Sequence, residues 1–502
     1  MPFKPIVLWT DALIYLILVV IVFFVWYVRS NKHLLEPWRR VGHSTSGMMA
    51  LTVLVFFITI GLLDTVHFRS AVENNRDTES GTIYSAEVLS LLDVIATPLR
   101  TRLEKTYSAP FATHLYTKET IELSDGKQVR EFPRLVFGGA NLQDPKTQFT
   151  ADFASRAFVG LSFGIFIWCI CAILLITLLA SMGGHKFSET LSIIWRNETE
   201  SPWKYVLLTL ALIFSLAGTA IILSAHYHIL GTDKVGQDVF YQSLKSIRTG
   251  LVIGTLTTLI MLPFAILLGI MAGYFKGWVD DVIQYTYTTL SSIPSVLLIA
   301  AAVLMMQVYT ETHLELFDTI AARADLRLLF LCIILGVTSW TGLCRLLRGE
   351  TLKLREMEYI QAAHAFGASH WRIISRHILP NVMHIILITT VMDFSGLVLA
   401  EAVLSYVGVG VDPSMISFGT MINAARLEMA REPMVWWPLL SAFSFMFALV
   451  LSANLFADSV QDAFNPRIKT SLIRIGKSCQ GKQGNKLENK VVVSITRDST
   501  SP

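Results

Sequence analysis

Long apolar runs are the feature that most constrains how this 502-residue chain can fold. A helix that crosses about 30 Å of hydrocarbon needs about 20 apolar residues, because each residue adds about 1.5 Å. The chain therefore predicts an all-α polytopic membrane protein with about nine transmembrane helices. The runs are Ile6–Val28, Met48–Leu63, Phe158–Ala180, Tyr205–Leu223, Leu251–Tyr274, Val282–Met306, Leu328–Leu347, Val382–Ala400 and Trp436–Phe456.

The composition supports a membrane protein and excludes two other classes. Hydrophobic residues make up 53% of the chain and charged residues 16%, which excludes a disordered protein. The net charge is only +3, and no basic stripe alternates with aromatic residues, so no nucleic-acid partner is expected. The first apolar run is too long for the core of a cleaved signal peptide. The chain is therefore expected to lie in a lipid bilayer.

Basic residues in the short loops predict the orientation. Arg29, Lys32, Arg39 and Arg40 follow the first run, so that loop is expected in the cytoplasm and the N-terminus outside. Alternation then places residues 64–157 outside. It places the basic loop 348–381 and the C-terminal tail inside, in agreement with the positive-inside rule.

The polarity pattern divides the chain into five parts. The stretch Ser85–Leu103 has apolar residues at helical spacing, and Glu119–Leu135 alternates around Asp125-Gly126, a hairpin signal. They predict a small α+β extracytoplasmic domain between the second and third spans. The parts are two N-terminal spans with a basic cytoplasmic loop (1–63), that domain (64–157), a third span with a cytoplasmic linker (158–204), a six-span core (205–467) and a flexible cytoplasmic tail (468–502).

The loop Arg348–Asn381 carries the clearest functional pattern. Good helix formers predict a helix over Glu350–Phe366, and Gly367 can adopt φ > 0 and end it. Ser369 is the expected N-cap of a second short helix toward Arg376, and Pro380 opens the next span. Small residues leave one side of the turn narrow. Such a helix pair suits insertion into a groove on a partner protein.

These residues resemble a known family. Gln361-Ala362-Ala363-x-x-x-Gly367, followed by His377-Ile378-Leu379-Pro380, resembles the EAA loop of ABC-importer permeases. The ending Arg376–Asn381 is similar to the dipeptide/oligopeptide (nickel) permease branch. Gln361 departs from the family pattern, which usually has Glu there.

Four further stretches resemble the same branch in the family's order. They are His228–Val239 (external HPLGTDxxGRD segment), Ala272–Asp281 (GYFGGWVD turn), Ala400–Gly410 (AEAALSFLGLG segment) and Ala457–Arg467 (GDALRDALDPR tail entry). The resemblance covers about residues 228–467. It does not cover the first three spans or the extracytoplasmic domain.

The resemblance implies a permease subunit of an ATP-driven, binding-protein-dependent ABC importer, expected for peptides, in the bacterial inner membrane. It implies a second permease, two ATPase subunits and an extracytoplasmic substrate-binding protein as partners. The chain has no G-x-x-x-x-G-K-[ST] stretch, so we expect no enzyme activity and no cofactor of its own. The residues implied in ATPase coupling are Glu350, Tyr359, Gln361, Ala362, Ala363, Gly367, His377, Leu379 and Pro380.

Two acidic residues are candidates for the translocation path. Asp393 lies well inside the eighth run, where a charge costs about 2.5–3.5 kcal/mol on insertion scales. It either lines the path or is a buried acid that is hydrogen-bonded to a neighbouring helix. Glu401 lies at the outer end of the same run, where a structural cap or pair is favoured over a path role. Pro263 and Pro294 are expected to kink their spans.

Three alternatives stay open. An importer of nickel or another small solute belongs to the same branch, although no His/Met-rich path supports it. A membrane sensor or scaffold would read ligands through the external domain, and a secondary transporter would show inverted repeats. No metal site is expected, because the histidines are divided between the two sides of the membrane: His226 and His228 outside, and His364, His370 and His377 inside.

Overall fold

The computed structural model describes residues 3–30, 32–71, 84–122, 128–184, 186–197, 199–313, 315 and 319–464. The expected tail 468–502 and the Asp125-Gly126 turn lie outside these described residues.

Helices dominate the fold. In the N-terminal half they are α1 (Trp9–Ser30), α2 (Lys32–His43), α3 (Thr45–Thr65), α4 (Leu91–Ile95), α5 (Thr97–Thr101), α6 (Pro145–Gly183), α7 (Phe187–Trp195) and α8 (Trp203–Ser224). In the C-terminal half they are α9 (Val239–Phe275), α10 (Trp278–Ser292), α11 (Ser295–Thr312), α12 (Ile320–Arg355), α13 (Glu358–Ala365), α14 (His370–Ile373), the π-helix η2 (Ile374–Ile378), α15 (Leu379–Val407), α16 (Phe418–Glu428) and α17 (Trp437–Phe464).

Eight helical segments in the described part are long and apolar enough to cross a membrane. They confirm a polytopic α-helical protein: α1, α3, α6, α8, α9, α11, His370–Val407 and α17. The run Leu328–Leu347 lies inside α12, whose packing along α9 is the most extensive helix contact.

Proline explains one departure from the expected spans. The run Val282–Met306 is not one helix but two, α10 and α11. Ile293 takes an extended conformation (φ −86°, ψ 130°), because a residue before proline is disfavoured in the helical region. Pro263, by contrast, stays inside the continuous helix α9.

Short strands form two small sheets in the described part of the chain. The N-terminal segment forms β1 (Phe3–Ile6), which pairs antiparallel with β2 (His67–Ser70), so α1 begins later than the first apolar run. β2 also pairs with β3 (Leu89–Ser90). The expected hairpin is present, with β4 (Glu119–Glu122) antiparallel to β5 (Gln128–Glu131). Residues 145–157, expected in the external domain, instead begin helix α6.

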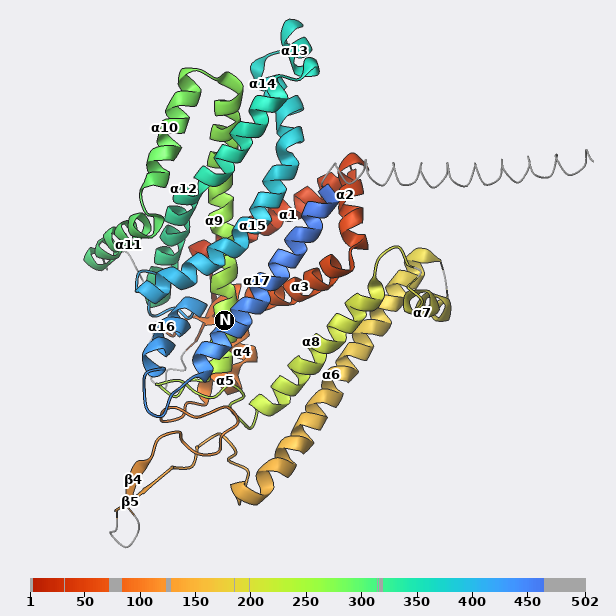
Figure 1. The fold of residues 1–502 in the computed structure, drawn as a ribbon. Coiled ribbons are helices and arrows are strands. Elements are labelled where there is room, and N and C mark those ends of the chain that lie inside the picture. The colour runs from red at the N-terminus through yellow and green to blue at the C-terminus, as the bar shows by residue number, and fades with distance from the viewer. Residues whose placement is uncertain are drawn as a thin grey trace, which may run out of the picture.

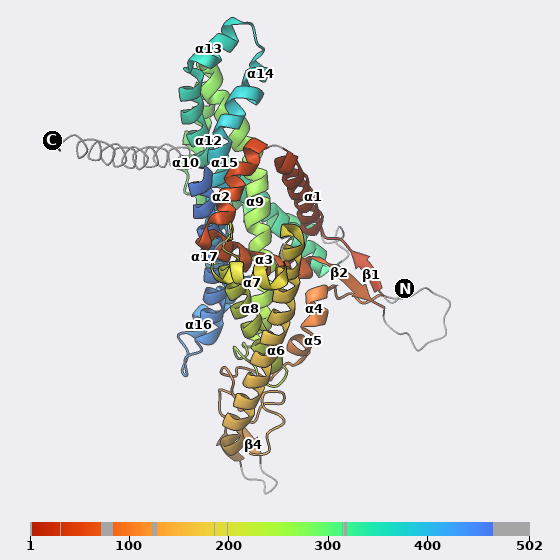
Figure 2. The same ribbon diagram turned by 90° about the vertical axis from the view of Figure 1, so that its right-hand side faces the viewer.

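The two ends of the molecule carry different elements (Figures 1 and 2). Helices α13 and α14 project beyond the bundle at one end. The β4–β5 hairpin, α4, α5 and α16 lie toward the other end, and the basic helix α2 lies in the half nearer α13. This is the arrangement expected if α2 and α13 face the cytoplasm.

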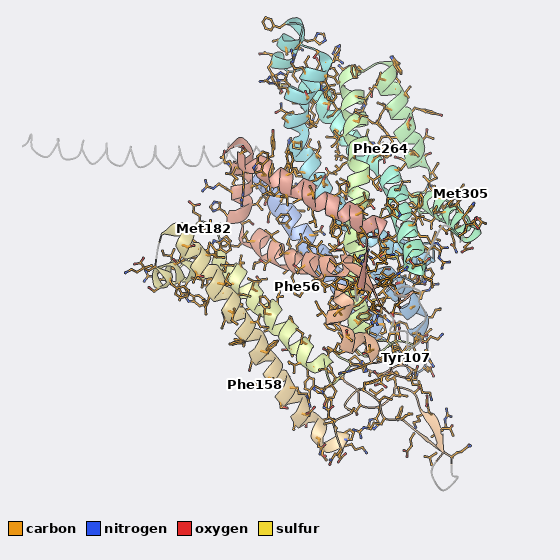
Figure 3. The ribbon with its side chains drawn as sticks, turned by 180° about the vertical axis from the view of Figure 1, so that it is seen from behind. Phe56, Tyr107, Phe158, Met182, Phe264 and Met305 are labelled. Atoms are coloured by element: carbon orange, nitrogen blue, oxygen red, sulfur yellow. The ribbon has the colours of Figure 1, made fainter. Side chains whose placement is uncertain are left out.

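Helix α8 has its main contact with α6 and not with the rest of the six-span core. Glycines bring the two backbones together, since a Cβ on Gly164 would lie 2.2 Å from the carbonyl oxygen of Phe214. The other side of α6 carries exposed apolar residues along its length, including Phe158 and Met182 (Figure 3). This hairpin meets the other helices mainly through α3, which itself packs against α17 and α9.

A buried ion cluster joins α1 to the core. Arg248 of α9 places Nη2 2.6 Å from Asp11 Oδ1 and 3.8 Å from Asp325 Oδ1. The backbone N–H of Thr10 donates to Asp325 Oδ2 at 3.1 Å. All four residues are buried, so the N-terminal helix is fixed to α9 and α12 by charges that water does not screen.

Candidate functional site

The loop that resembles the EAA motif forms a sharp helical turn. The N–H of Gly367 donates to His364 O (3.0 Å), and the N–H of Ala368 donates to Ala363 O (3.1 Å). Gly367 has φ +74°, so α13 ends in a Schellman motif. No atom lies within 4 Å of the position a Cβ would take on Gly367. The glycine is therefore required for its backbone conformation and not for space.

The first half of the loop differs from the expected single helix over Glu350–Phe366. α12 continues to Arg355, and a separate helix, α13, begins at Glu358. Contacts with the end of α9 explain the break. Arg355 Nη1 donates to the carbonyl oxygen of Tyr274 (2.8 Å), and Lys276 Nζ lies 2.8 Å from Glu356 Oε1. The chain turns here because residues far away in the sequence bond Arg355 and Glu356, which lie on the two sides of the junction.

Apolar anchors hold the helix pair on the bundle. Ile360 of α13, Ile373 of α14 and Ile378 of η2 are buried in one cluster with residues of α9 and α12. Tyr274 adds a hydrogen bond between its hydroxyl and His370 Nδ1 at 2.8 Å. Just before the loop, Arg348 forms a bidentate pair with Asp280 at 2.6 and 2.7 Å. The loop is thus a rigid extension of α9, α10 and α12.

The outer side of the helix pair is apolar and exposed. Phe366 is 90% exposed and Trp371 74% exposed, and both lie beside the Gly367 turn. Met357 and Tyr359 are exposed as well. Large aromatic residues that project from a rigid element are typical of a protein-binding surface. Neither residue is among the predicted coupling residues, although the aromatic type is a signal that the sequence offers.

The other predicted coupling residues surround this turn. Gln361 and Ala362 are exposed, and Ala363 packs partly against the buried cluster. Tyr359 accepts a hydrogen bond from Asn381 (3.2 Å), which brings α13 to the start of α15, where Leu379 and Pro380 lie. The His377 ring lies 6.1 Å from that of Tyr359. Glu350 lies apart from this group, on α12, paired with Lys353 at 3.0 Å.

The two candidate path residues have different surroundings. Glu401 is buried and accepts hydrogen bonds from Ser405 and Ser417, each at 2.8 Å, so it ties α15 to the start of α16. Asp393 is half-buried on α15. Within the described residues, no ion pair or side-chain hydrogen bond to it is found.

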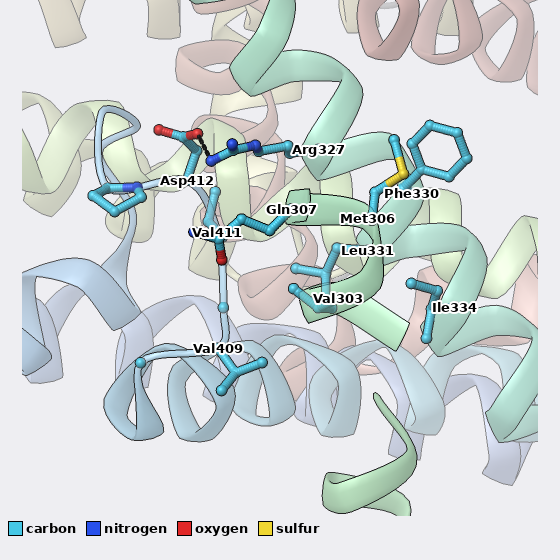
Figure 4. Close-up of a pocket in the computed structure, with 13 residues that line it drawn as sticks. Val303, Met306, Gln307, Arg327, Phe330, Leu331, Ile334, Val409, Val411 and Asp412 are labelled. Atoms are coloured by element: carbon cyan, nitrogen blue, oxygen red, sulfur yellow. Dashed lines mark hydrogen bonds and ion pairs between the residues drawn. The ribbon is translucent and has the colours of Figure 1, made fainter. Parts of the chain in front are cut away.

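A cavity of ≈ 110 Å³ lies where α11, α12 and the segment after α15 meet (Figure 4). Arg327 lies at this cavity and pairs with Asp412 at 2.6 Å. The segment Gly408–Pro413 lines one wall, and its first residues belong to the AEAALSFLGLG-like stretch. That motif therefore helps to close the bundle near α16.

An ionic cluster that we call the external clamp holds the segment between α8 and α9. It consists of Glu104, His228 and Asp238. His228 Nδ1 lies 2.7 Å from Asp238 Oδ2, and its Nε2 lies 3.5 Å from Glu104 Oε1. Asp238 also caps α9 by accepting from the N–H of Phe240 at 2.8 Å. The clamp thus joins the segment between α5 and β4 to the HPLGTDxxGRD-like segment.

Burial and charge both shape the clamp. Burial disfavours the His228 cation, but Asp238 and Glu104 outweigh it and raise the pKa of His228 to about 9. Burial likewise opposes the Glu104 carboxylate. His228 and the backbone N–H groups of residues 136–138 nevertheless lower the pKa of Glu104 to about 2. At neutral pH the His228 cation therefore lies beside the Glu104 carboxylate.

Comparisons with known proteins agree with these features. Residues 265–470 match the family described as "Binding-protein-dependent transport system inner membrane component". The oligopeptide transport system permease protein OppC of Mycobacterium tuberculosis is 32% identical over 239 residues, covering 48% of this chain and 76% of that protein. The chain belongs to the permease subunits of ABC importers. It is thus a multi-pass protein of the bacterial inner membrane that works with ATPase subunits and is not itself an enzyme.

Other permeases are similar over the same share of the chain. The glutathione transport system permease protein GsiD of Pectobacterium atrosepticum is 32% identical, covering 49% of this permease and 74% of that protein. The dipeptide transport system permease protein DppC of Bacillus subtilis is 28% identical, covering 48% of this chain and 69% of that protein. A solved inward-facing MetNI methionine ABC transporter is 17% identical with a TM-score of 0.33. The match covers 44% of this chain and 94% of that chain. The family match begins inside α9, so α1–α8 lie outside it.

Proposed function

We propose that this permease carries peptides across the inner membrane, paired with a second permease subunit, two ATPase subunits and an extracytoplasmic substrate-binding protein. The names of the similar permeases support the substrate class, since they refer to oligopeptide, dipeptide and glutathione transport. The proposed division is an N-terminal two-span unit (1–63), an external domain (64–157), a third span (158–204), a permease core (205–467) and a tail (468–502).

The projecting helix pair is the observation that supports ATPase coupling most strongly. In the proposal, α13 and α14 dock in a groove of an ATPase subunit, with Phe366 and Trp371 as the apolar anchors. The anchors Ile360 and Ile373 fix this pair to the bundle. Closure of the ATPases would then push α12 and α15 together with the loop, and this rigid-body motion would alternate access to the two sides.

A charge placed on this surface tests the coupling proposal. Trp371→Glu should prevent co-purification of the ATPase and stop ATP-dependent uptake, because a carboxylate would have to lose water in an apolar groove. Trp195→Glu on α7 is the matched control, since Trp195 is 66% exposed but lies away from the loop. Normal ATPase recovery and uptake in Trp371→Glu would refute the docking role of α14.

A further inference from the structure

A hydroxyl-lined crevice lies where α10 gives way to α11, beside α12. Its volume is ≈ 390 Å³. The break in Figure 1 between α10 and α11 marks its position. Five hydroxyl side chains contribute to its lining: Ser291, Ser292, Ser295, Thr338 and Thr341.

The crevice lies at the break between α10 and α11, beside the middle of α12. Pro294 immediately precedes α11, and Thr338 lies at the middle of α12. At the break, the N–H of Ile293 donates to Leu290 O (3.3 Å), and Pro294 O accepts from the N–H of Leu297 (3.0 Å).

Polar side chains are also exposed on the neighbouring surface, beside the apolar Val282 and Leu297. Tyr285, Thr286 and Thr289 are exposed on α10, which is not among the apolar spanning helices. On α12, the exposed Arg345 lies one helical turn from Thr341 toward the coupling loop. Its guanidinium lies 5.1 Å from the ring of Tyr287, and no carboxylate within the described residues pairs with it.

We propose that the crevice is a water-filled binding site for a peptide in transit, with Arg345 as the receptor of its carboxylate. This inference rests on the proposed function and names a substrate site for it. Hydroxyls can both donate and accept, so they can pair with main-chain N–H and C=O groups whatever the peptide's side chains. The planar, permanently charged guanidinium matches a carboxylate in bidentate geometry. The volume falls within the range of small-ligand pockets.

Accessibility to water tests the first part of the inference. The complete transporter, with the native cysteines of this chain replaced, carries Ser292→Cys or Thr341→Cys and is treated with a membrane-impermeant maleimide. Both thiols should react, because a thiol forms the reactive thiolate in water and not in lipid. Ser162→Cys on the exposed side of α6 is the matched control and should stay unreactive. Unreactive thiols at both crevice positions would show that the second permease or lipid covers the crevice, and would overturn the proposal.

Ligand chemistry tests the second part. Tri-alanine should slow the labelling of Thr341→Cys at least tenfold, and tri-alanine with an amidated C-terminus should have a much smaller effect. Arg345→Gln should remove this difference between the two peptides, whereas Arg345→Lys should keep part of it. Equal protection by both peptides, or none by either, would overturn the assignment of Arg345.

Uptake separates this inference from the proposed function. In reconstituted transporters that retain their ATPase subunits, Thr341→Val should reduce tri-alanine uptake, since valine keeps the shape of threonine and removes its hydroxyl. Thr209→Val on α8, where Thr209 is half-buried and does not line the crevice, is the control and should leave uptake normal. Peptide uptake by the wild type together with normal uptake by Thr341→Val would overturn the crevice alone. Failure of the wild type to take up any peptide would refute the proposed function, and with it the peptide site.

Discussion

The turn at Gly367 provides the sharpest test of ATPase coupling, through Gly367→Val. The glycine holds φ +74°, a conformation that costs an L-residue about 1–2 kcal/mol, and a β-branched side chain makes it a strong outlier. Because no atom lies within 4 Å of the Cβ position, the penalty comes from the backbone alone. A loss of this size lowers the equilibrium constant for the docking-competent turn roughly 5- to 30-fold, and the apparent ATPase affinity falls by up to the same factor.

The assay measures ATPase affinity for the purified permease and ATP-dependent uptake in proteoliposomes. Gly184→Val is the matched control, because Gly184 at the end of α6 has φ +67° and equally open surroundings. Gly367→Asn should restore most of the affinity, since asparagine tolerates the left-handed region. Unchanged affinity and uptake in Gly367→Val would refute the reasoning. An equal loss in Gly184→Val would show that the effect is general instability.

Three further outcomes are expected. Ala363→Asp should abolish ATPase association while leaving membrane insertion intact, as seen by co-purification from membranes, because Ala363 packs against the loop's buried cluster and lies in no span. Arg348→Gln should lower the free energy of unfolding by about 1.5–3 kcal/mol, measured as a lower melting temperature. The double variant with Asp280→Asn should lose less stability than the sum of the two single variants, since the two residues form one ion pair. Thermal stability should decline between pH 6.5 and 9, because the raised pKa of His228 stabilises the fold fully only below 6.5; His228→Gln should flatten that decline.

Features that depend on residues close together in the sequence could be predicted from the sequence pattern. Gly367 ends α13 as expected, because a helix C-terminus with a left-handed residue is a local event. The hairpin and the apolar runs were likewise predictable from periodicity. The break after Arg355 was missed, since residues 356–358 are acceptable in a helix. Its cause lies in Tyr274 and Lys276 at the end of α9, far away in the sequence.

Long-range pairing accounts for the other omissions. The strand β1 forms only because residues 67–70 return beside it, so the apolar run alone could not show it. The external clamp joins Glu104 to a segment that follows two later spans. The family resemblance included Asp238, but Glu104 lies in the part of the chain that it does not cover. The acid on the other side of His228 could therefore be identified only in the folded structure.

Helix α9 connects the two regions that the family motifs mark. Its first turn is capped by Asp238 of the external clamp, and its last residues contact the coupling loop through Tyr274. The helix has 37 residues, so it spans about 55 Å without a break. Its buried packing along α12 keeps it rigid. A displacement that starts at α13 and α14 is therefore expected to reach the Glu104–His228–Asp238 clamp through α9.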